Sequence, residues 1–342
     1  MVPLHIKKPR HAQRGLSLVE VMVGVTISLL LLAGVIQLFV SSKQGYQVIQ
    51  SSGRMQENAR YAVMLLGNSL RMADNWGGID GDDVTVDGAL AITGTGTCTE
   101  AWIADPGTGI QGFEGGGVPP ACIPAADYVA DSDAFVVRYA AAEGMVADAD
   151  LNTVTNASNV FVRVTIGARG FLFNGSGVGN IPSDLLAPTA TATNTYNFPY
   201  MTELYFVRPC SVKSGATCAA TDDGGRPIPT LVRYTLQGNA FVEQPLVDGV
   251  EQMQIEYGID TDGDRSADQF FTADAIADWD TVVAVRYGLL MRGDELDVAT
   301  PDLENMTFTM PGSYTFSPPA GVENRYQRKL FVDTVQLRNR TR

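Results

Sequence analysis

The sequence predicts an α+β protein in which one long N-terminal helix is followed by a domain of mainly antiparallel β-sheet with long loops. Two observations carry this prediction. An apolar run near the N-terminus passes, without a proline, into a segment with helical spacing. The second half of the chain instead contains short segments in which polar and apolar residues alternate. With 342 residues, 45% of them apolar, the chain can bury a sizeable core.

The first part of the helix is expected to cross a membrane. Residues 16–40 read LSLVEVMVGVTISLLLLAGVIQLFV, a run of 25 residues with a single ionisable side chain, Glu20. About 20 such residues span a bilayer as a helix. The run is longer than the apolar part of a secretory signal peptide, typically about 7 to 15 residues, and no cleavage site with small residues follows it. The span should therefore stay with the protein.

The charge distribution orients this span. The first fifteen residues contain four Lys or Arg and no acid, whereas the whole chain has a net charge of -14. The positive-inside tendency places residues 1–15 in the cytoplasm and the domain that follows the span outside it. An acidic domain repels phosphate, so no binding to nucleic acid is expected.

The junction between the basic segment and the span reads Arg14-Gly15-Leu16-Ser17-Leu18-Val19-Glu20. It resembles the class III signal peptide of type IV pilins and pseudopilins, which a prepilin peptidase cuts after the glycine and methylates at the new N-terminus. The resemblance implies a leader of residues 1–15, cleavage between Gly15 and Leu16, and N-methylation of Leu16. The family more often has Phe at the first mature position, and Leu16 departs from that pattern.

The same resemblance implies that Glu20 is the glutamate which the family keeps at its fifth mature position. A carboxylate in hydrocarbon costs several kcal/mol and is usually retained for a partner. At low dielectric, a carboxylate and an ammonium stabilise each other far better than either is stabilised alone. Glu20 is therefore expected to pair with the amine of Leu16 on a neighbouring subunit.

The helix is expected to continue over residues 41–75 as an amphipathic segment. Apolar residues recur there at spacings of three and four and define one helical face: Ala59, Val63, Leu66, Leu70 and Ala73. Three glycines lower the helix preference of the middle part and favour a local break there: Gly34, Gly45 and Gly53. The segment 74–78, DNWGG, provides the stop.

Residues 76–342 form the expected β domain. Gly, Thr, Asp and Pro are abundant from residue 79 to about residue 130, which predicts loops with short strands. Seven clearer strand candidates follow: 134–140, 159–166, 203–209, 230–236, 253–259, 282–292 and 330–338. Alternation with one polar face, and the lack of helix-length segments between the later candidates, predict antiparallel pairing.

The β domain contains four cysteines: Cys98, Cys122, Cys210 and Cys218. An even number on the oxidising side of a membrane predicts two disulfides, with three connectivities open. The expectation is that sequence neighbours pair, Cys98 with Cys122 and Cys210 with Cys218. A thiolate metal site is the alternative, although the spacings contain no C-x-x-C pair.

The segment 260–268, DTDGDRSAD, places oxygen-bearing side chains at every second position, as calcium-binding loops do. The candidate calcium ligands are Asp260, Asp262, Asp264, Ser266 and Asp268. The glycine comes fourth instead of sixth, and Phe271 stands where an EF-hand has its bidentate glutamate. These departures favour the competing interpretation, a polar hairpin loop in which Asp and Gly serve turn chemistry.

An enzyme is not expected. Both histidines, His5 and His11, lie in the expected leader, so the processed chain would contain none. Serine and cysteine triads with an imidazole base, and zinc sites that use histidine, are then excluded. No P-loop or dinucleotide-binding glycine motif follows a strand. Calcium is the one cofactor that the sequence suggests.

Three further segments resemble PilW-type minor pilins: 250–258 with the acidic loop that follows, 278–286, and 337–340. The resemblance implies a pilin-like fold, with the helix packed on the sheet. It also implies a low-abundance subunit that joins other minor pilins to prime type IV pilus assembly, at the filament tip.

Partners and location follow from the same resemblance. The implied partners are other minor pilins, the major pilin, the inner-membrane assembly platform, the prepilin peptidase and a tip adhesin. The chain would cross the bacterial inner membrane once before assembly, with its C-terminal domain in the periplasm, and then enter the pilus. The processes implied are twitching motility and cell adhesion.

Two alternatives remain open from the sequence. A J-type pseudopilin of type II secretion shares the leader, Glu20 and the long helix, but such proteins are usually shorter. A signal-anchored periplasmic enzyme or binding protein would share only the membrane span, and it would keep residues 1–15.

Overall fold

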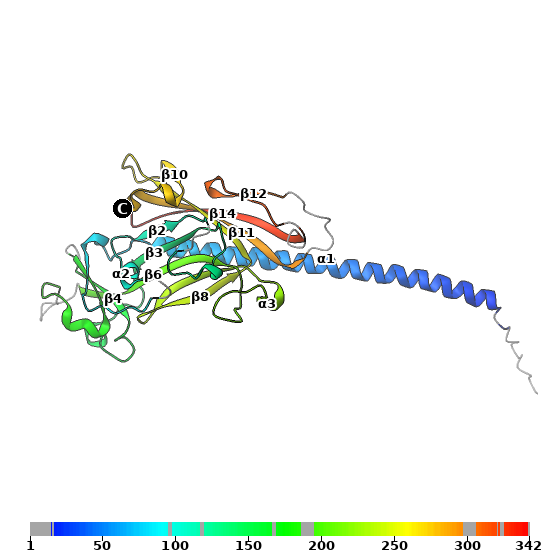
Figure 1. Ribbon diagram of the computed structural model, residues 1–342, viewed down its shortest axis with the longest axis horizontal. Coiled ribbons are helices and arrows are strands. Elements are labelled where there is room, and N and C mark those ends of the chain that lie inside the picture. Colours follow the sequence, from blue (N-terminus) through cyan, green and yellow to red (C-terminus); the bar gives the residue numbers. More distant parts are fainter. Residues whose placement is uncertain are drawn as a thin grey trace, which may run out of the picture. The chain divides into compact units, whose positions relative to one another are not determined.

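The computed structural model describes residues 15, 17–94, 98–116, 120–165, 169–185, 195–296, 306–319, 321 and 325–340. The chain forms two compact units, residues 1–50 and residues 51–342. The long helix α1, Leu18–Met72, contributes to both of them (Figure 1). The other elements all belong to the second unit, so the predicted α+β class is confirmed.

α1 is one uninterrupted helix, and the predicted local break is wrong. The hydroxyl of Ser17 accepts the N–H of Glu20 at 3.2 Å and so satisfies one of the unpaired donors at the helix start. Each glycine in the middle part costs only about 1 kcal/mol relative to alanine, and isolated residues of this kind do not offset the cooperative hydrogen-bond ladder around them. The helix ends at Met72, and Asp74 and Gly77 then adopt positive φ angles of 63° and 70°.

The larger sheet has eight strands in the order β1-β5-β4-β6-β3-β2, and β7 and β8 follow from β6. Most neighbours pair antiparallel, as predicted, but β1 and β5 pair parallel. These two strands are joined by a long connection, so no hairpin imposes an antiparallel arrangement. The strands are β1 Val84–Val86, β2 Ile110–Phe113, β3 Ala134–Ala140, β4 Val160–Thr165, β5 Arg169–Asn174, β6 Thr195–Arg208, β7 Thr230–Gln237 and β8 Ala240–Asp248.

A second, four-stranded sheet is antiparallel throughout, in the order β10-β9-β11-β14. A two-stranded hairpin, β12 with β13, is separate from both sheets. These strands are β9 Val250–Ile259, β10 Gln269–Phe271, β11 Val282–Leu296, β12 Phe308–Thr309, β13 Thr315–Phe316 and β14 Tyr326–Gln336.

All seven strand candidates are present, and β3 has the predicted bounds. The strands that sequence reasoning missed are mostly two to four residues long. β5 and β8 are longer. β8 contains Pro245, which argues against a strand in a single sequence.

Short helical segments interrupt the loops. Two are α-helical, α2 Glu100–Ile103 and α3 Asp222–Gly225. The others are 3-10 turns: η1 Gly81–Asp83, η2 Ala125–Asp127, η3 Asp148–Asp150, η4 Gly175–Asn180, η5 Ala273–Ala275, η6 Trp279–Thr281 and η7 Pro311–Ser313.

The main core of the second unit lies between α1 and the two sheets. Ala59, Leu66, Leu70 and Ala73 are fully buried, which confirms the predicted apolar face, and Val63 packs at its margin. The cluster around them includes residues of β3, β6, β7, β9, β11 and β14. Small residues on this face let the helix approach the sheets closely.

A second core covers the opposite face of the larger sheet. Ile103 and Cys122 from the loop-rich region 79–130 pack there on Val162 and Phe206, together with Trp76 from the segment that ends the helix. The predicted loops are therefore held against the sheet as a layer of the domain.

Residues 339–340 contact the C-terminal end of α1. The side-chain amide of Asn339 donates to the carbonyl of Ala73 at 2.9 Å, and also to the carbonyls of Arg71 and Met72. Arg340 forms an ion pair with Asp74 at 2.8 Å. These contacts satisfy carbonyl groups that a helix terminus leaves unpaired.

Both predicted disulfides are present, Cys98 with Cys122 and Cys210 with Cys218. The described cysteines include no free thiol, so the thiolate metal site is ruled out. Lys213 lies within the loop that the second disulfide closes. Its ammonium group forms ion pairs with Asp127 at 2.7 Å and with Glu243 at 2.6 Å, which fix the loop to the rest of the domain.

Candidate functional sites

The helix of the first unit exposes an apolar surface along its whole length. Every residue from Leu18 to Val40 is exposed, with Leu30 at 75% and Leu38 at 72%. The most apolar 18-residue window has a mean hydropathy of 2.4, and none of it is buried. A helix that buries nothing within its own chain needs lipid or the apolar helices of other subunits.

The residues predicted for processing lie at the start of this helix. Gly15 is exposed, and Leu16 lies outside the described residues. Glu20 is exposed in the first turn of α1, and its carboxylate forms no ion pair with any residue that the structure describes. The N-terminal end of the helix dipole favours an acid at this position. The carboxylate is thus free to meet a cation on another chain.

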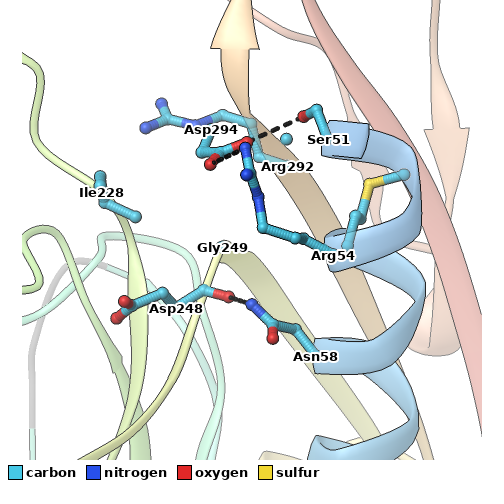
Figure 2. Close-up of a pocket in the computed structure, with 10 residues that line it drawn as sticks. Ser51, Arg54, Asn58, Ile228, Asp248, Gly249, Arg292 and Asp294 are labelled. Atoms are coloured by element: carbon cyan, nitrogen blue, oxygen red, sulfur yellow. Dashed lines mark hydrogen bonds and ion pairs between the residues drawn. The ribbon is translucent and has the colours of Figure 1, made fainter. Parts of the chain in front are cut away.

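In the second unit, a polar clasp holds α1 to the second sheet (Figure 2). The guanidinium of Arg54 pairs with Asp294 at 2.6 Å, and the buried hydroxyl of Ser51 donates to the same carboxylate at 2.9 Å. Burial opposes ionisation of Asp294, but the bonds from Arg54 and Ser51 hold its pKa below the usual value. One turn further along α1, Asn58 donates at 3.0 Å to the carbonyl of Asp248, which ends β8 of the larger sheet.

The clasp surrounds a small cavity of about 170 Å³, which Ile228, Gly249 and Arg292 also line (Figure 2). Gly249 has a φ of 85°, and a Cβ there would lie 2.7 Å from the carbonyl oxygen of Arg292. Only glycine fits this turn between β8 and β9. With its charges already paired, the clasp can fix the helix to the sheet. Sequence reasoning missed it because its members are up to 243 positions apart.

A buried hydrogen-bond network fixes α1 to the larger sheet. Ser69 on the helix donates to Glu203 at 2.7 Å and contacts the hydroxyl of Tyr205 at 2.7 Å. Glu203 is only 2% exposed, and its other oxygen pairs with Arg233 at 2.6 Å. Burial raises the pKa of Tyr205 well above its usual value, so its hydroxyl stays protonated as a donor.

A second buried carboxylate, that of Asp133, joins the two sheets. It lies just before β3 and accepts the N–H of Ile255 in β9 at 2.6 Å and the N–H of Gly115 at 2.8 Å. Its own N–H donates to the carbonyl of Met253 at 2.9 Å. Burial, reinforced by the nearby carboxylate of Glu114, raises the pKa of Asp133 to about 7.

This pKa predicts that the domain loses stability as the pH rises from about 4 to about 7. The folded state keeps a proton on Asp133 that the unfolded chain, with an ordinary pKa of 3.8, releases. We expect Asp133→Asn to remove most of this loss, which is on the order of a few kcal/mol. Urea unfolding at a series of pH values measures it.

The matched control for this prediction is Asp131→Asn. Asp131 is exposed and contributes its backbone carbonyl, to which Gln252 and Gln254 donate. Its substitution should leave the pH dependence unchanged. An Asp133→Asn variant whose unfolding midpoint still falls with pH as in the natural chain would contradict the assignment.

The acidic loop brings together only part of the predicted calcium set. Carboxylate oxygens of Asp260, Asp262 and Asp268 lie within 4.8 Å of one another. Asp264 is not in this group, and its carboxylate accepts the N–H of Ser266 at 2.8 Å and the hydroxyl of the same residue at 2.5 Å.

The same carboxylates also satisfy the backbone of the loop. Asp260 accepts the N–H groups of Gly263 at 2.7 Å and Arg265 at 2.8 Å, and both of these residues have positive φ angles. Although partial burial opposes ionisation, these bonds keep the pKa of Asp260 below its usual value. The hydroxyl of Thr261 lowers the pKa of Asp268 in the same way. Turn chemistry therefore accounts for these side chains without a cation.

Two family comparisons match this chain. Residues 212–339 match the family described as "PilW: Type IV Pilus-assembly protein W". Residues 10–36 match the "Prokaryotic N-terminal methylation motif". The C-terminal part of the chain is thus similar to the PilW family, and its N-terminal part to the methylation motif. No curated protein and no solved structure matches it significantly.

The two matches fall on the parts of the structure described above. The methylation motif spans Gly15 and Glu20 at the start of the exposed helix. The PilW region contains β7 to β14, the acidic loop, and Asn339, which caps α1. The two matches together support a pilin of the type IV pilus, and the matched PilW family is described as a pilus-assembly protein.

Proposed function

We propose that this PilW-type chain helps to prime type IV pilus assembly, as one member of a minor-pilin complex at the filament tip. The observation that carries the proposal is the exposed apolar part of α1, which has one carboxylate near its start. The same helix continues into the second unit, where it packs on a β domain similar to the PilW family. An apolar helix of this kind can leave the lipid bilayer only if it packs on the helices of other subunits.

Processing at the N-terminus is part of the proposal. The prepilin peptidase would cut between Gly15 and Leu16 and methylate Leu16, and Glu20 would then pair with the amine of a neighbouring subunit. The neighbours are other minor pilins and the major pilin, delivered by the inner-membrane assembly platform, and a tip adhesin would sit beyond them. Before assembly the β domain lies in the periplasm.

Deletion of the gene tests this function against the pseudopilin alternative. We expect loss of sheared surface pili and of twitching motility, with normal release of enzymes into the medium, and restoration by the natural gene. Loss of secretion with normal pili would instead identify a J-type pseudopilin of type II secretion. If neither output changed, an anchored enzyme or binding protein would replace the proposal.

Calcium at the acidic loop is a second, separate proposal, supported by the three adjacent carboxylates. Millimolar calcium is then expected to raise the Tm of the full chain by several degrees, because a ligand that binds only the folded state stabilises it. Asp262→Asn removes one of the three carboxylates and should abolish the increase. Asp262 is the residue to change because it makes fewer backbone contacts than Asp260, so its substitution disturbs the turn less. An unchanged Tm would contradict calcium binding and would mean that the carboxylates only stabilise the turn.

A further inference from the structure

The exposed helix of the first unit contains one apolar stretch whose length matches a bilayer. Residues 21–40 contain no ionisable side chain, and all of them are exposed. As a helix with a rise of about 1.5 Å per residue, this stretch measures about 30 Å. The hydrocarbon core of a typical bilayer is also about 30 Å thick. The stretch therefore fills the hydrocarbon once, without excess length.

Ionisable side chains flank the stretch on both sides. Glu20 directly precedes it, and Lys43 is the first charged residue that follows it. A span shifted to residues 16–35 would put the carboxylate of Glu20 into hydrocarbon, which is unfavourable, and would leave Phe39 in the polar layer. A span of residues 21–40 avoids both costs.

The direction of helical side chains bears on where the flanking groups lie. The Cα–Cβ bonds of an α-helix tilt toward its N-terminus. At the start of the span, this tilt carries the carboxylate of Glu20 away from the hydrocarbon and into the nearer headgroup layer. At the other end, the tilt turns the side chains that follow the span back toward the membrane. A group that binds headgroups at this end must therefore begin about one turn beyond the last apolar residue.

Lys43 and Tyr46 meet this condition. Their Cα atoms lie about 4.5 Å and about 9 Å beyond Val40 along the helix. Each headgroup layer is about 5–7 Å thick. Both side chains are exposed, Tyr46 at 67%, and a separation of three positions places them on one face of α1. Turned back along the helix, the ammonium and the phenol hydroxyl reach the layer of lipid phosphates.

The chemistry of the two side chains suits this layer. An ammonium offers three N–H donors to an anionic phosphate, and its methylene stem can lie on apolar surface. Tyrosine is enriched at membrane interfaces because its ring is apolar while its hydroxyl stays hydrated. Within one helical turn on either side of Lys43 there is no acid, so its own helix supplies no carboxylate for the ammonium.

We propose that Lys43 and Tyr46 bind phospholipid headgroups in the leaflet on the C-terminal side of the span, with the ammonium of Lys43 paired to lipid phosphate. The pair would hold residues 21–40 in the hydrocarbon and Glu20 in the opposite headgroup layer. The carboxylate then stays hydrated while the chain is in the membrane. It loses water only when the helix leaves the bilayer to pack on other helices.

Nitroxide labels on the full chain, in vesicles of phosphatidylethanolamine and phosphatidylglycerol, measure the position of the span. Because the four cysteines form two disulfides, one introduced cysteine carries the label. Collisions with oxygen and with a water-soluble nickel chelate report its depth. A label at Leu30 should lie about 7 Å deeper than a label at Val25, since Leu30 is central in residues 21–40. Equal depths, or a deeper label at Val25, would overturn the proposal.

Variants at position 43 separate loss of the cation from added apolar surface. Lys43→Leu should draw a label at Ser42 about 2–4 Å toward the hydrocarbon, on the order of one or two residues. Lys43→Arg should not, because the guanidinium also pairs with phosphate. Gln44→Leu is the matched control, since it adds a leucine at the next position and keeps Lys43. An unchanged depth in Lys43→Leu, or an equal shift in Gln44→Leu, would refute the role of the ammonium.

Tyr46 is tested in the same way. Tyr46→Ala combined with Lys43→Leu should move the Ser42 label further than Lys43→Leu does alone. No further movement would remove Tyr46 from the proposal. A depth that changes with the ratio of protein to lipid would show contact with second copies of the chain in place of lipid, and would overturn it. Intact mass should show both disulfides in every variant.

These outcomes are independent of the proposed pilus function, because the vesicles contain no other pilin. If deletion abolishes pili but the labels contradict the expected depths, the headgroup contact is wrong and the minor-pilin function stands. If the labels behave as expected while deletion leaves pili unchanged, the headgroup contact stands and the minor-pilin function fails.

Discussion

Glu20→Ala is expected to leave cleavage after Gly15 intact and to abolish incorporation of the chain into pili. The carboxylate lies in the first turn of an otherwise apolar, exposed helix and has no partner among the residues that the structure describes. Once the helix packs among others, its opposite charge would be the amine of Leu16 on a neighbour. Loss of one partner of a buried ion pair costs about 3–5 kcal/mol, which weakens docking more than a hundredfold.

Two measurements on the same cells check this. Intact mass of the membrane protein should show loss of residues 1–15 in both the natural chain and the variant, while sheared pili should contain only the natural chain. Thr26→Ala is the matched control, because its hydroxyl bonds to carbonyl groups of its own helix, those of Met22 and Val23. Normal incorporation of Glu20→Ala would refute the assembly role, and residues 1–15 still attached would refute class III processing.

Glu203→Ala is expected to destabilise the β domain by about 3–5 kcal/mol, the cost of removing one member of a buried charge pair. The substitution leaves Arg233 without its carboxylate and deprives the hydroxyls of Ser69 and Tyr205 of an acceptor. Because Ser69 belongs to α1, the loss should also loosen the helix from the sheet. Urea unfolding of the full chain in detergent measures the change.

The control here is Glu57→Ala, which removes an exposed acid from the same helix and should change the free energy of unfolding by no more than about 0.5 kcal/mol. Ser69→Ala combined with Glu203→Ala should cost less than the sum of the two single changes, because the residues share one network. Equal effects of Glu203→Ala and Glu57→Ala would show that the buried network contributes nothing.

Local patterns predicted the elements well wherever one physical rule dominated. The buried strand β3 has its predicted bounds, and the apolar face of α1 from Ala59 to Ala73 is buried as the spacing requires. The expected break at the glycines was wrong, since a propensity cost of about 1 kcal/mol per residue does not overcome the cooperativity of a continuous helix. The parallel pairing of β1 with β5 also escaped prediction.

By itself, the sequence determined the properties that depend on composition and short-range order. These are the apolar span with Glu20, the basic segment before it, the α+β class and the even number of cysteines, whose pairing as neighbours only the structure decided. Each follows from transfer free energies, periodicity or cysteine count within a short stretch of chain.

Only the tertiary structure decided which distant groups meet. The clasp of Ser51 with Asp294, the buried Glu203 beneath α1, and the cap of Asn339 on Ala73 join positions 134 to 266 residues apart. The carboxylate of Asp133 likewise bridges two sheets, and β14 pairs with β11, 30 or more positions away in the chain. Such juxtapositions depend on how sheets stack and in which order strands pair, and local propensities along the chain do not contain that information.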